Sequence, residues 1–168
     1  PYNTIELMEA FEEQGAQINF IIGQGVGLFN TDNGWSGNLN EIDEYSGYWI
    51  NISPDINLQV NMPGHFSENL VYNLNAGNNL ISYTGSEGAT TEQAIGCHLG
   101  AVNFLIGQGV GIFLVDDCLI GWPDCWSGNL NQLDKWKGYW LNADYNMDFY
   151  WCTETPSMNI SSTNINLG

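Results

Sequence analysis

The segment INFIIGQGVGLF (residues 18–29) occurs a second time as VNFLIGQGVGIF (residues 102–113), with nine of twelve positions identical. A longer block, WSGNLNEIDEYSGYWIN (35–51), returns as WSGNLNQLDKWKGYWLN (126–142), with eleven of seventeen positions identical. The first block recurs at an offset of 84 residues and the second at an offset of 91. Two blocks that recur in the same order indicate that one small unit has been duplicated.

A helix is predicted at the start of each copy. In the first copy, Asn3 or Thr4 is a candidate N-cap, and Ile5, Met8 and Phe11 recur at helical spacing. The second copy has TTEQAIGCHLGAV (90–102), which begins with the pattern of a capping box but contains two glycines that weaken a helix.

The glycine block has two interpretations. As one strand it places alternate apolar residues on one face and glycines on the other, and a glycine face lets an aromatic ring approach closely. In this interpretation the apolar face of the first copy holds Ile18, Phe20, Ile22, Val26 and Leu28. Alternatively, Gly-Gln-Gly is a turn that joins two short strands.

Together these patterns predict an α+β fold made of two pseudo-symmetric copies of a small, mostly antiparallel sheet with one helix each. The predicted boundaries are 1–64 for the first copy, 65–157 for the second and 158–168 for an extended tail. Because no long linker separates the copies, we expect that they could share one core. The chain starts with neither Met nor a signal segment, so we expect a processed product or part of a longer protein.

The two copies differ in what precedes them. A strand-like segment, NNLISY (78–83), stands before the second copy, whereas the first copy begins directly at its helix. We hypothesise that the polar tail SMNISSTNINLG (157–168) supplies the missing strand, to its own first copy or to a neighbouring molecule. The alternative is an ordinary flexible terminus.

The chain is strongly acidic, and this limits its partners. It has 19 acidic residues against two lysines, and a formal net charge of −17. Such a surface repels phosphate backbones and anionic membranes, which argues against nucleic-acid binding. No apolar run is long enough for membrane insertion. We therefore expect a homo-oligomer or the neighbouring modules of a surface assembly as partners, with a glycan as another possibility.

Four cysteines predict disulfides. Cys118 and Cys125 flank a short loop and favour a local pair, which leaves Cys97 to pair with Cys152. The rival interpretation is a zinc site, but the spacing lacks a C-x2-C element. Disulfides indicate an extracellular or cell-surface location.

The sequence presents no recognisable catalytic machinery, so we expect that the protein is not an enzyme. The glycine block is G-x-G-x-G and is followed by strand-like residues, unlike a dinucleotide fingerprint. His65 and His98 lie in unlike contexts, and neither recurs in the other copy. The acidic cluster Glu41, Asp43 and Glu44 keeps only its aspartate in the second copy, which favours a solvated surface over a glycosidase pair.

No cofactor is predicted, although calcium is a possible ligand. Oxygen-bearing side chains gather in the turn NTDNG (30–34) and around Asp116, Asp117 and Asp124. Neither segment resembles a complete calcium motif, and Asn and Asp favour turns without any metal.

Aromatic residues at matching places of the two copies are the candidate ligand-binding residues. Flat rings stack on sugars, but the same rings also complete thin cores and interfaces. The candidates are Trp35, Tyr48, Trp49, Trp126, Tyr139 and Trp140. Two glycosylation sequons begin at Asn51 and Asn159.

The pattern I-x-G-x-G, W-x-G-x-L-x-x-L and G-Y-W resembles a repeat module of large secreted or surface proteins of bacteria, often marine ones. The resemblance covers about half of the residues directly. It implies modularity and an extracellular location, and it brings no activity with it. We therefore predict a non-enzymatic structural or adhesive module that self-associates, with a carbohydrate-binding module as the alternative.

Overall fold

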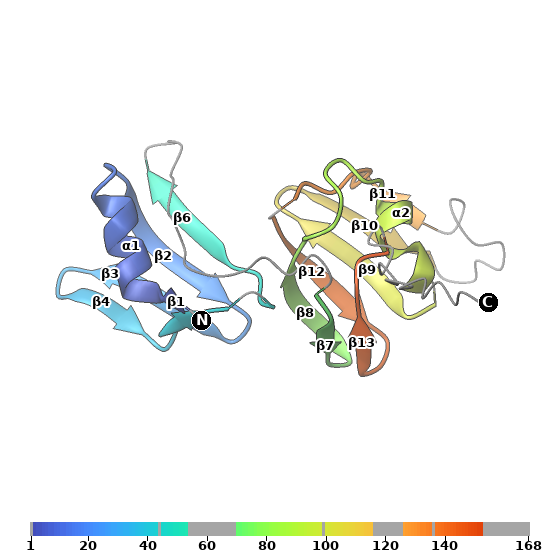
Figure 1. The fold of residues 1–168 in the computed structure, drawn as a ribbon, viewed down its shortest axis with the longest axis horizontal. Coiled ribbons are helices and arrows are strands. Elements are labelled where there is room, and N and C mark those ends of the chain that lie inside the picture. Colours follow the sequence, from blue (N-terminus) through green and yellow to red (C-terminus); the bar gives the residue numbers. More distant parts are fainter. Residues whose placement is uncertain are drawn as a thin grey trace, which may run out of the picture.

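The computed structural model describes residues 2–43, 45–53, 70–98, 100–115, 126–135 and 137–152. These residues form two lobes, each built around an antiparallel sheet (Figure 1). In the described part of the chain only two short α-helices accompany the sheets. The predicted mixed α+β class, with mostly antiparallel strands, is confirmed at this level.

The first lobe has a four-stranded sheet in the order β4-β3-β2-β6. A short pair, β1 with β5, lies beside this sheet, and helix α1 follows β1. The elements are β1 (Tyr2–Asn3), α1 (Thr4–Glu12), β2 (Gln17–Gly23), β3 (Val26–Thr31), β4 (Gly34–Gly37), β5 (Glu41–Ile42) and β6 (Trp49–Ser53).

The second lobe has a five-stranded sheet in the order β11-β10-β9-β12-β8. Strands β7 and β13 form a separate pair, and helix α2 continues into a 3-10 turn, η1. The elements are β7 (Tyr72–Leu74), β8 (Gly77–Ser82), α2 (Thr91–Ile95), η1 (Gly96–His98), β9 (Val102–Gly107), β10 (Val110–Leu114), β11 (Trp126–Gly128), β12 (Gly138–Ala143) and β13 (Met147–Phe149).

The glycine block is a hairpin in both lobes, so the interpretation as one strand is wrong. Gly23 pairs with Val26 and Gly107 pairs with Val110, which leaves two-residue loops. Each loop ends on a glycine with a positive φ, 72° at Gly25 and 74° at Gly109. A residue without a Cβ adopts this conformation at low cost, which explains the Gly-Gln-Gly pattern.

A bulge between Ile18 and Phe20 changes which residues face the core. Ile18 and Ile21 are buried, whereas Phe20 and Ile22 are only partly buried. The predicted alternation of apolar residues therefore fails at this point, because one extra residue in a strand moves all later side chains to the other face.

The helices begin where their caps predicted. The Asn3 side chain accepts hydrogen bonds from the backbone N–H groups of Ile5 and Glu6. Thr90 and Gln93 form the expected capping box of α2, which ends after five residues, just before Gly96. Ile5, predicted on the buried face of α1, is instead 41% exposed.

The repeated Trp-Ser-Gly-Asn motif closes tightly over the glycine hairpin. A Cβ on Gly37 would lie 2.1 Å from the carbonyl oxygen of Gly27. The next residue, Asn38, accepts a hydrogen bond from the N–H of Gly27 through its Oδ1 (2.9 Å). Gly128 and Asn129 make the same contacts in the second lobe, where the Cβ distance is also 2.1 Å and the hydrogen bond is 2.9 Å. Only glycine fits where two backbones approach this closely.

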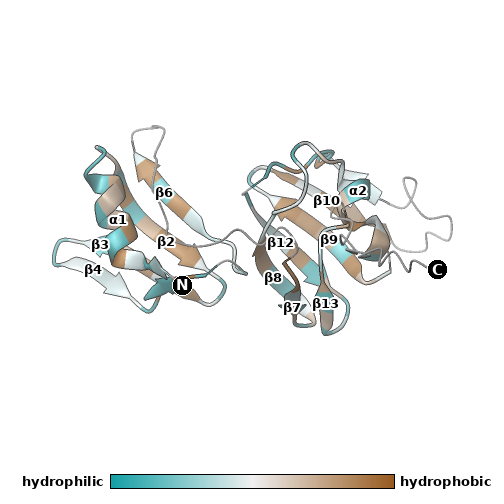
Figure 2. Cartoon of the chain, viewed as in Figure 1, coloured by the Kyte–Doolittle hydropathy of each residue, from teal (hydrophilic) through white to brown (hydrophobic). Residues whose placement is uncertain are grey.

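Each lobe has a hydrophobic core of its own. One cluster of buried residues includes Met8, Ile21 and Leu39, and a separate, larger cluster includes Leu141 and Trp151. Figure 2 shows apolar bands on α1, β2 and β6 in one lobe and on β9 and β10 in the other. The buried residues therefore do not form the single shared core that the short separation of the copies suggested.

Candidate functional site

The two lobes meet where the first hairpin touches the outer edge of β8. Gln24 Nε2 donates a hydrogen bond to the carbonyl oxygen of Asn78 (2.8 Å), and Gln24 Oε1 accepts one from the N–H of Leu80 (3.0 Å). The N–H of Gly47 also donates to the carbonyl oxygen of Leu80 (2.9 Å). One side-chain amide thus binds the main chain of β8 much as a neighbouring strand would.

Among the described residues, strand β12 has a neighbour on its outer edge and strand β6 has none. In the second lobe, β12 lies between β9 and β8 and pairs with β8 over six residues, from Gly138–Ser82 to Ala143–Gly77. The aligned strand β6 pairs with β2. Among the described residues no strand pairs with the other edge of β6.

A position that is buried on β12 is exposed on β6. Leu141 on β12 is fully buried, with 0% of its surface exposed, whereas the aligned Ile50 on β6 is 39% exposed. An uncovered strand edge with an apolar side chain beside it is a ready template for another strand.

A row of asparagines ends at the same edge. In the second lobe Asn103 Nδ2 donates to Asn142 Oδ1 (2.9 Å), and Asn142 Nδ2 donates to Asn78 Oδ1 (2.7 Å). In the first lobe Asn19 Nδ2 donates to Asn51 Oδ1 (2.6 Å). Asn51 Nδ2, the counterpart of the group that reaches β8, donates to no other described residue.

A cavity of about 850 Å³ lies along β6, and we call it the β6 cavity. One wall consists of Phe20, Trp49, Ile50 and Asn51 from the first lobe. The facing wall belongs to the second lobe and includes Gln108. This volume is in the range of clefts that bind ligands or peptide side chains.

A second cavity, of about 600 Å³, has a wall formed by the same positions of the repeat. Gln24 and Asn38 line it, as Gln108 and Asn129 line the β6 cavity. Leu80 of β8 projects into the smaller cavity. The β6 cavity has no counterpart of Leu80 among its lining residues, and it lies beside the edge of β6 with which no described strand pairs.

The charged and phenolic groups at the β6 cavity form local pairs. Lys137 Nζ and Asp134 Oδ2 make a short, exposed ion pair, and the hydrogen bond that Lys137 donates to Asp134 raises the pKa of Lys137. The pKa of Tyr139 is raised chiefly by burial, and its oxygen accepts a hydrogen bond from the N–H of Asp134 (3.0 Å). Burial likewise raises the pKa of Tyr48. The phenols are therefore neutral near pH 7 and act as hydrogen-bonding groups.

The six candidate aromatic residues are distributed between the cores and the lobe junction. Trp35 packs against the first core and Trp126 against the second, and Tyr139 is buried. Tyr48, Trp49 and Trp140 are partly buried. The Tyr48 ring lies over Gly23 and the Tyr139 ring over Gly107, where a Cβ would be 3.1 Å and 2.9 Å from ring carbons. The glycine face does accommodate aromatic rings, as the sequence predicted.

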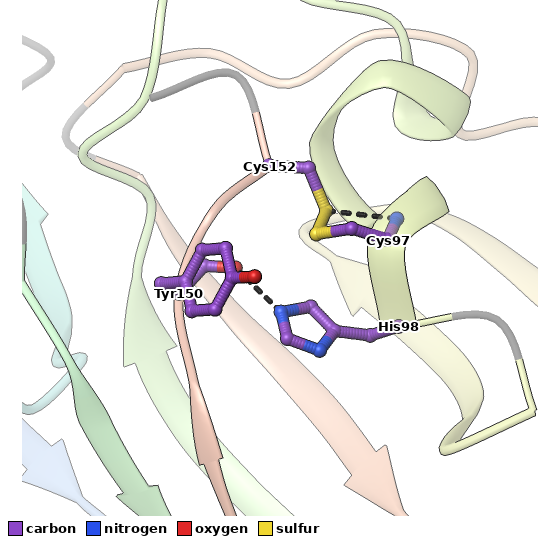
Figure 3. The surroundings of a disulfide bond; sticks show 4 residues. All are labelled: Cys97, His98, Tyr150 and Cys152. Carbon is purple, nitrogen blue, oxygen red and sulfur yellow. Dashed lines mark hydrogen bonds between the residues drawn. A yellow bond between two sulfur atoms is a disulfide. The ribbon is translucent and has the colours of Figure 1, made fainter. Parts of the chain in front are cut away.

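The disulfide joins Cys97 of η1 to Cys152, which follows β13 (Figure 3). His98 lies beside it, with Nε2 placed 2.9 Å from the carbonyl oxygen of Tyr150. A carbonyl only accepts, so Nε2 carries the hydrogen. Burial lowers the pKa of His98, partly opposed by this hydrogen bond. In the described part of the chain, His98 and the two bonded cysteines are the only cluster with metal-ligand geometry, and their sulfurs are committed to the disulfide.

The predicted acidic and turn residues have local structural roles where they are described. Asp43 accepts hydrogen bonds from the N–H of Tyr45 (2.8 Å) and the hydroxyl of Ser46 (3.0 Å). The calcium candidate at 30–34 is the turn between β3 and β4, where Thr31 Oγ1 donates to the carbonyl oxygen of Gly34 (2.6 Å). Outside the described residues lie Glu44, His65, the pair Cys118 and Cys125, the candidate ligands Asp116, Asp117 and Asp124, the sequon at Asn159 and the tail 158–168.

Sequence reasoning missed the role of the polar residues at the lobe junction, and it named one of them, Asn51, only as a glycosylation sequon. Gln24, Gln108, Asn19 and Asn51 all lie in the repeated blocks, so their recurrence was the available signal. It also missed exposed phenylalanines at a repeated position: Phe29 is 47% exposed, and its ring centroid lies 6.1 Å from that of Phe20.

The chain matches no protein-family model, no curated protein and no solved structure. Among the described helices, none has the length and apolar character needed to cross a membrane.

Proposed function

We propose that this chain is a non-enzymatic structural or adhesive module of an extracellular or cell-surface assembly, and that it self-associates by strand addition at β6. In this proposal two pseudo-symmetric copies of one unit pack so that the glycine hairpin of one copy supports the leading strand of the other. The disulfide between Cys97 and Cys152 is compatible with an oxidising location.

One comparison carries the proposal. The repeated segments GYWIN (47–51) and GYWLN (138–142) are identical at four of five positions, yet β12 has a strand on its outer edge and β6 has none among the described residues. An antiparallel edge exposes alternate N–H and C=O groups that a further strand can satisfy. Strand addition of this kind is a known mode of protein–protein recognition, in which main-chain hydrogen bonds supply the affinity.

Sedimentation equilibrium of the intact chain tests self-association. We expect the average mass to rise with concentration for the natural sequence and to stay at the monomer value for Ile50→Lys, because an edge lysine opposes strand pairing. Ile5→Lys is a matched control, since Ile5 is 41% exposed and Ile50 39%. A chain that is monomeric at every concentration, or one that associates equally well with Ile50→Lys, contradicts the proposal.

A further inference from the structure

The contacts of Gln24 show how the glycine hairpin binds a strand. Its side-chain amide donates to the carbonyl oxygen of Asn78 and accepts from the N–H of Leu80. These two main-chain groups flank a single residue on the free edge of β8. One glutamine therefore satisfies two adjacent polar groups that would otherwise face water or another chain.

Gln108 occupies the same position of the second hairpin. Its loop has the same two-residue length, and the glycine that follows it has nearly the same φ as Gly25. Its side chain is exposed, lines the β6 cavity and hydrogen-bonds to no other described residue. A strand that lies in the cavity is thus offered the same donor and acceptor that Gln24 gives to β8.

The opposite wall offers a second specific contact. Asn142 hydrogen-bonds to Asn78 of β8, whereas the Nδ2 group of its counterpart Asn51, on the edge of β6, has no acceptor among the described residues. An asparagine in an added strand, placed opposite Asn51, would extend the row from Asn19 by one residue. Side-chain pairs of this kind set the register of neighbouring strands.

We infer that the β6 cavity binds an extended segment of the sequence type Asn-x-Leu, held between the edge of β6 and the side-chain amide of Gln108. This inference rests on the proposed function and specifies its partner: the leading strand of another repeat unit, with the chemistry of β8. The asparagine lies opposite Asn51, and the leucine two residues later lies opposite Trp49, as Leu80 lies opposite Trp140.

A peptide with the sequence of residues 77–83, GNNLISY, is the probe. We expect the labelled peptide to bind the intact chain in a fluorescence-anisotropy titration and to shift the NMR signals of the Gln108 and Asn51 side-chain amides. Gln108→Ala removes two hydrogen bonds and should weaken binding about tenfold. Gln108→Glu keeps an acceptor but loses the donor, so it should also weaken binding. Gln14→Ala, in the turn that follows α1, is the control and should change nothing.

A second peptide tests the asparagine. Replacing the residue that corresponds to Asn78 by alanine should weaken binding severalfold to the natural chain and have little effect on binding to Asn51→Ala. Absence of binding at millimolar peptide overturns the inference, as do equal affinities for the natural chain and Gln108→Ala. A chain that stays monomeric but binds the peptide in this way contradicts self-association and supports the inference. A chain whose self-association depends on Ile50, but which does not bind the peptide, supports self-association and contradicts the inference.

Discussion

Replacing Gln24 by alanine tests whether one side chain joins the two lobes. The substitution removes the hydrogen bonds from Gln24 to the carbonyl oxygen of Asn78 and from the N–H of Leu80 to Gln24. It leaves the bond between Gly47 and the carbonyl oxygen of Leu80 in place. The perturbation is therefore confined to the edge of β8.

The expected size follows from these contacts. Each hydrogen bond contributes about 0.5–1.5 kcal/mol net, so the two together contribute about 1–3 kcal/mol. Because 1.4 kcal/mol corresponds to a factor of ten, the local opening of this edge should become roughly 5-fold to 150-fold more frequent.

Amide hydrogen exchange measured residue by residue is the assay. The N–H of Leu80 should lose protection by this factor in Gln24→Ala, while amides in the middle of β9, away from the junction, keep theirs. Gln108→Ala is the matched control, because Gln108 occupies the same loop position and has no partner among the described residues. Unchanged protection at Leu80 in Gln24→Ala would refute the account of the lobe junction.

Three further predictions concern stability. Gly128→Ala places a methyl group against backbone and should lower the unfolding free energy by more than about 3 kcal/mol. Gly109→Ala meets nothing within 4 Å and should lower it by only about 1–2 kcal/mol, because of the positive φ. Denaturant titration measures both. Replacing Cys97 and Cys152 together by serine opens a loop closed across 55 residues and should cost about 4 kcal/mol, measured in the same way. Burial lowers the pKa of His98 below 6.5, so the stability of the fold falls as the pH drops through 6.5 toward the folded-state pKa. His98→Gln should lose less stability over this interval, as measured by melting curves at different pH values.

The sequence predicted the features that depend on neighbouring residues. The capping box of Thr90 and Gln93 joins residues three apart, whereas the rings over Gly23 and Gly107 come from Tyr48 and Tyr139, farther along the chain. The pairing of Cys97 with Cys152, preferred among the three pairings that four cysteines allow, is present in the structure. The capping box is fixed by residues close together in the sequence, and the cysteine pairing had only three alternatives.

The features that failed depend on a backbone irregularity. A bulge after Ile18 brings Ile21 to the core, and a two-residue loop then brings Leu28 to the same side. In a continuous strand Ile21 and Leu28, an odd number of residues apart, would face opposite sides. Apolar periodicity therefore predicted a strand-rich block but not its fold into a hairpin.

The candidate site was hidden for a different reason. A glutamine on a hairpin loop shows no apolar period, and its partner is the backbone of β8, 54 and 56 residues away. The repeated aromatic residues are distinctive in sequence, but in the structure they pack against the two cores or lie at the lobe junction. Because Gln24 binds main-chain groups of β8, the residue types in β8 do not reveal this contact.

Ile50 and Leu141 show that the burial of a repeated residue depends on its surroundings as well as on the sequence of the repeat. Both lie in the same motif and on aligned strands, and both are apolar, so the motif itself predicts equal burial. The exposures of 39% and 0% therefore reflect what surrounds each copy: among the described residues β8 pairs with the outer edge of β12, whereas no strand pairs with that edge of β6. In the proposed self-association, the position at which the burial of the two copies differs marks the surface that an added strand would cover. On this chain that position is the edge of β6.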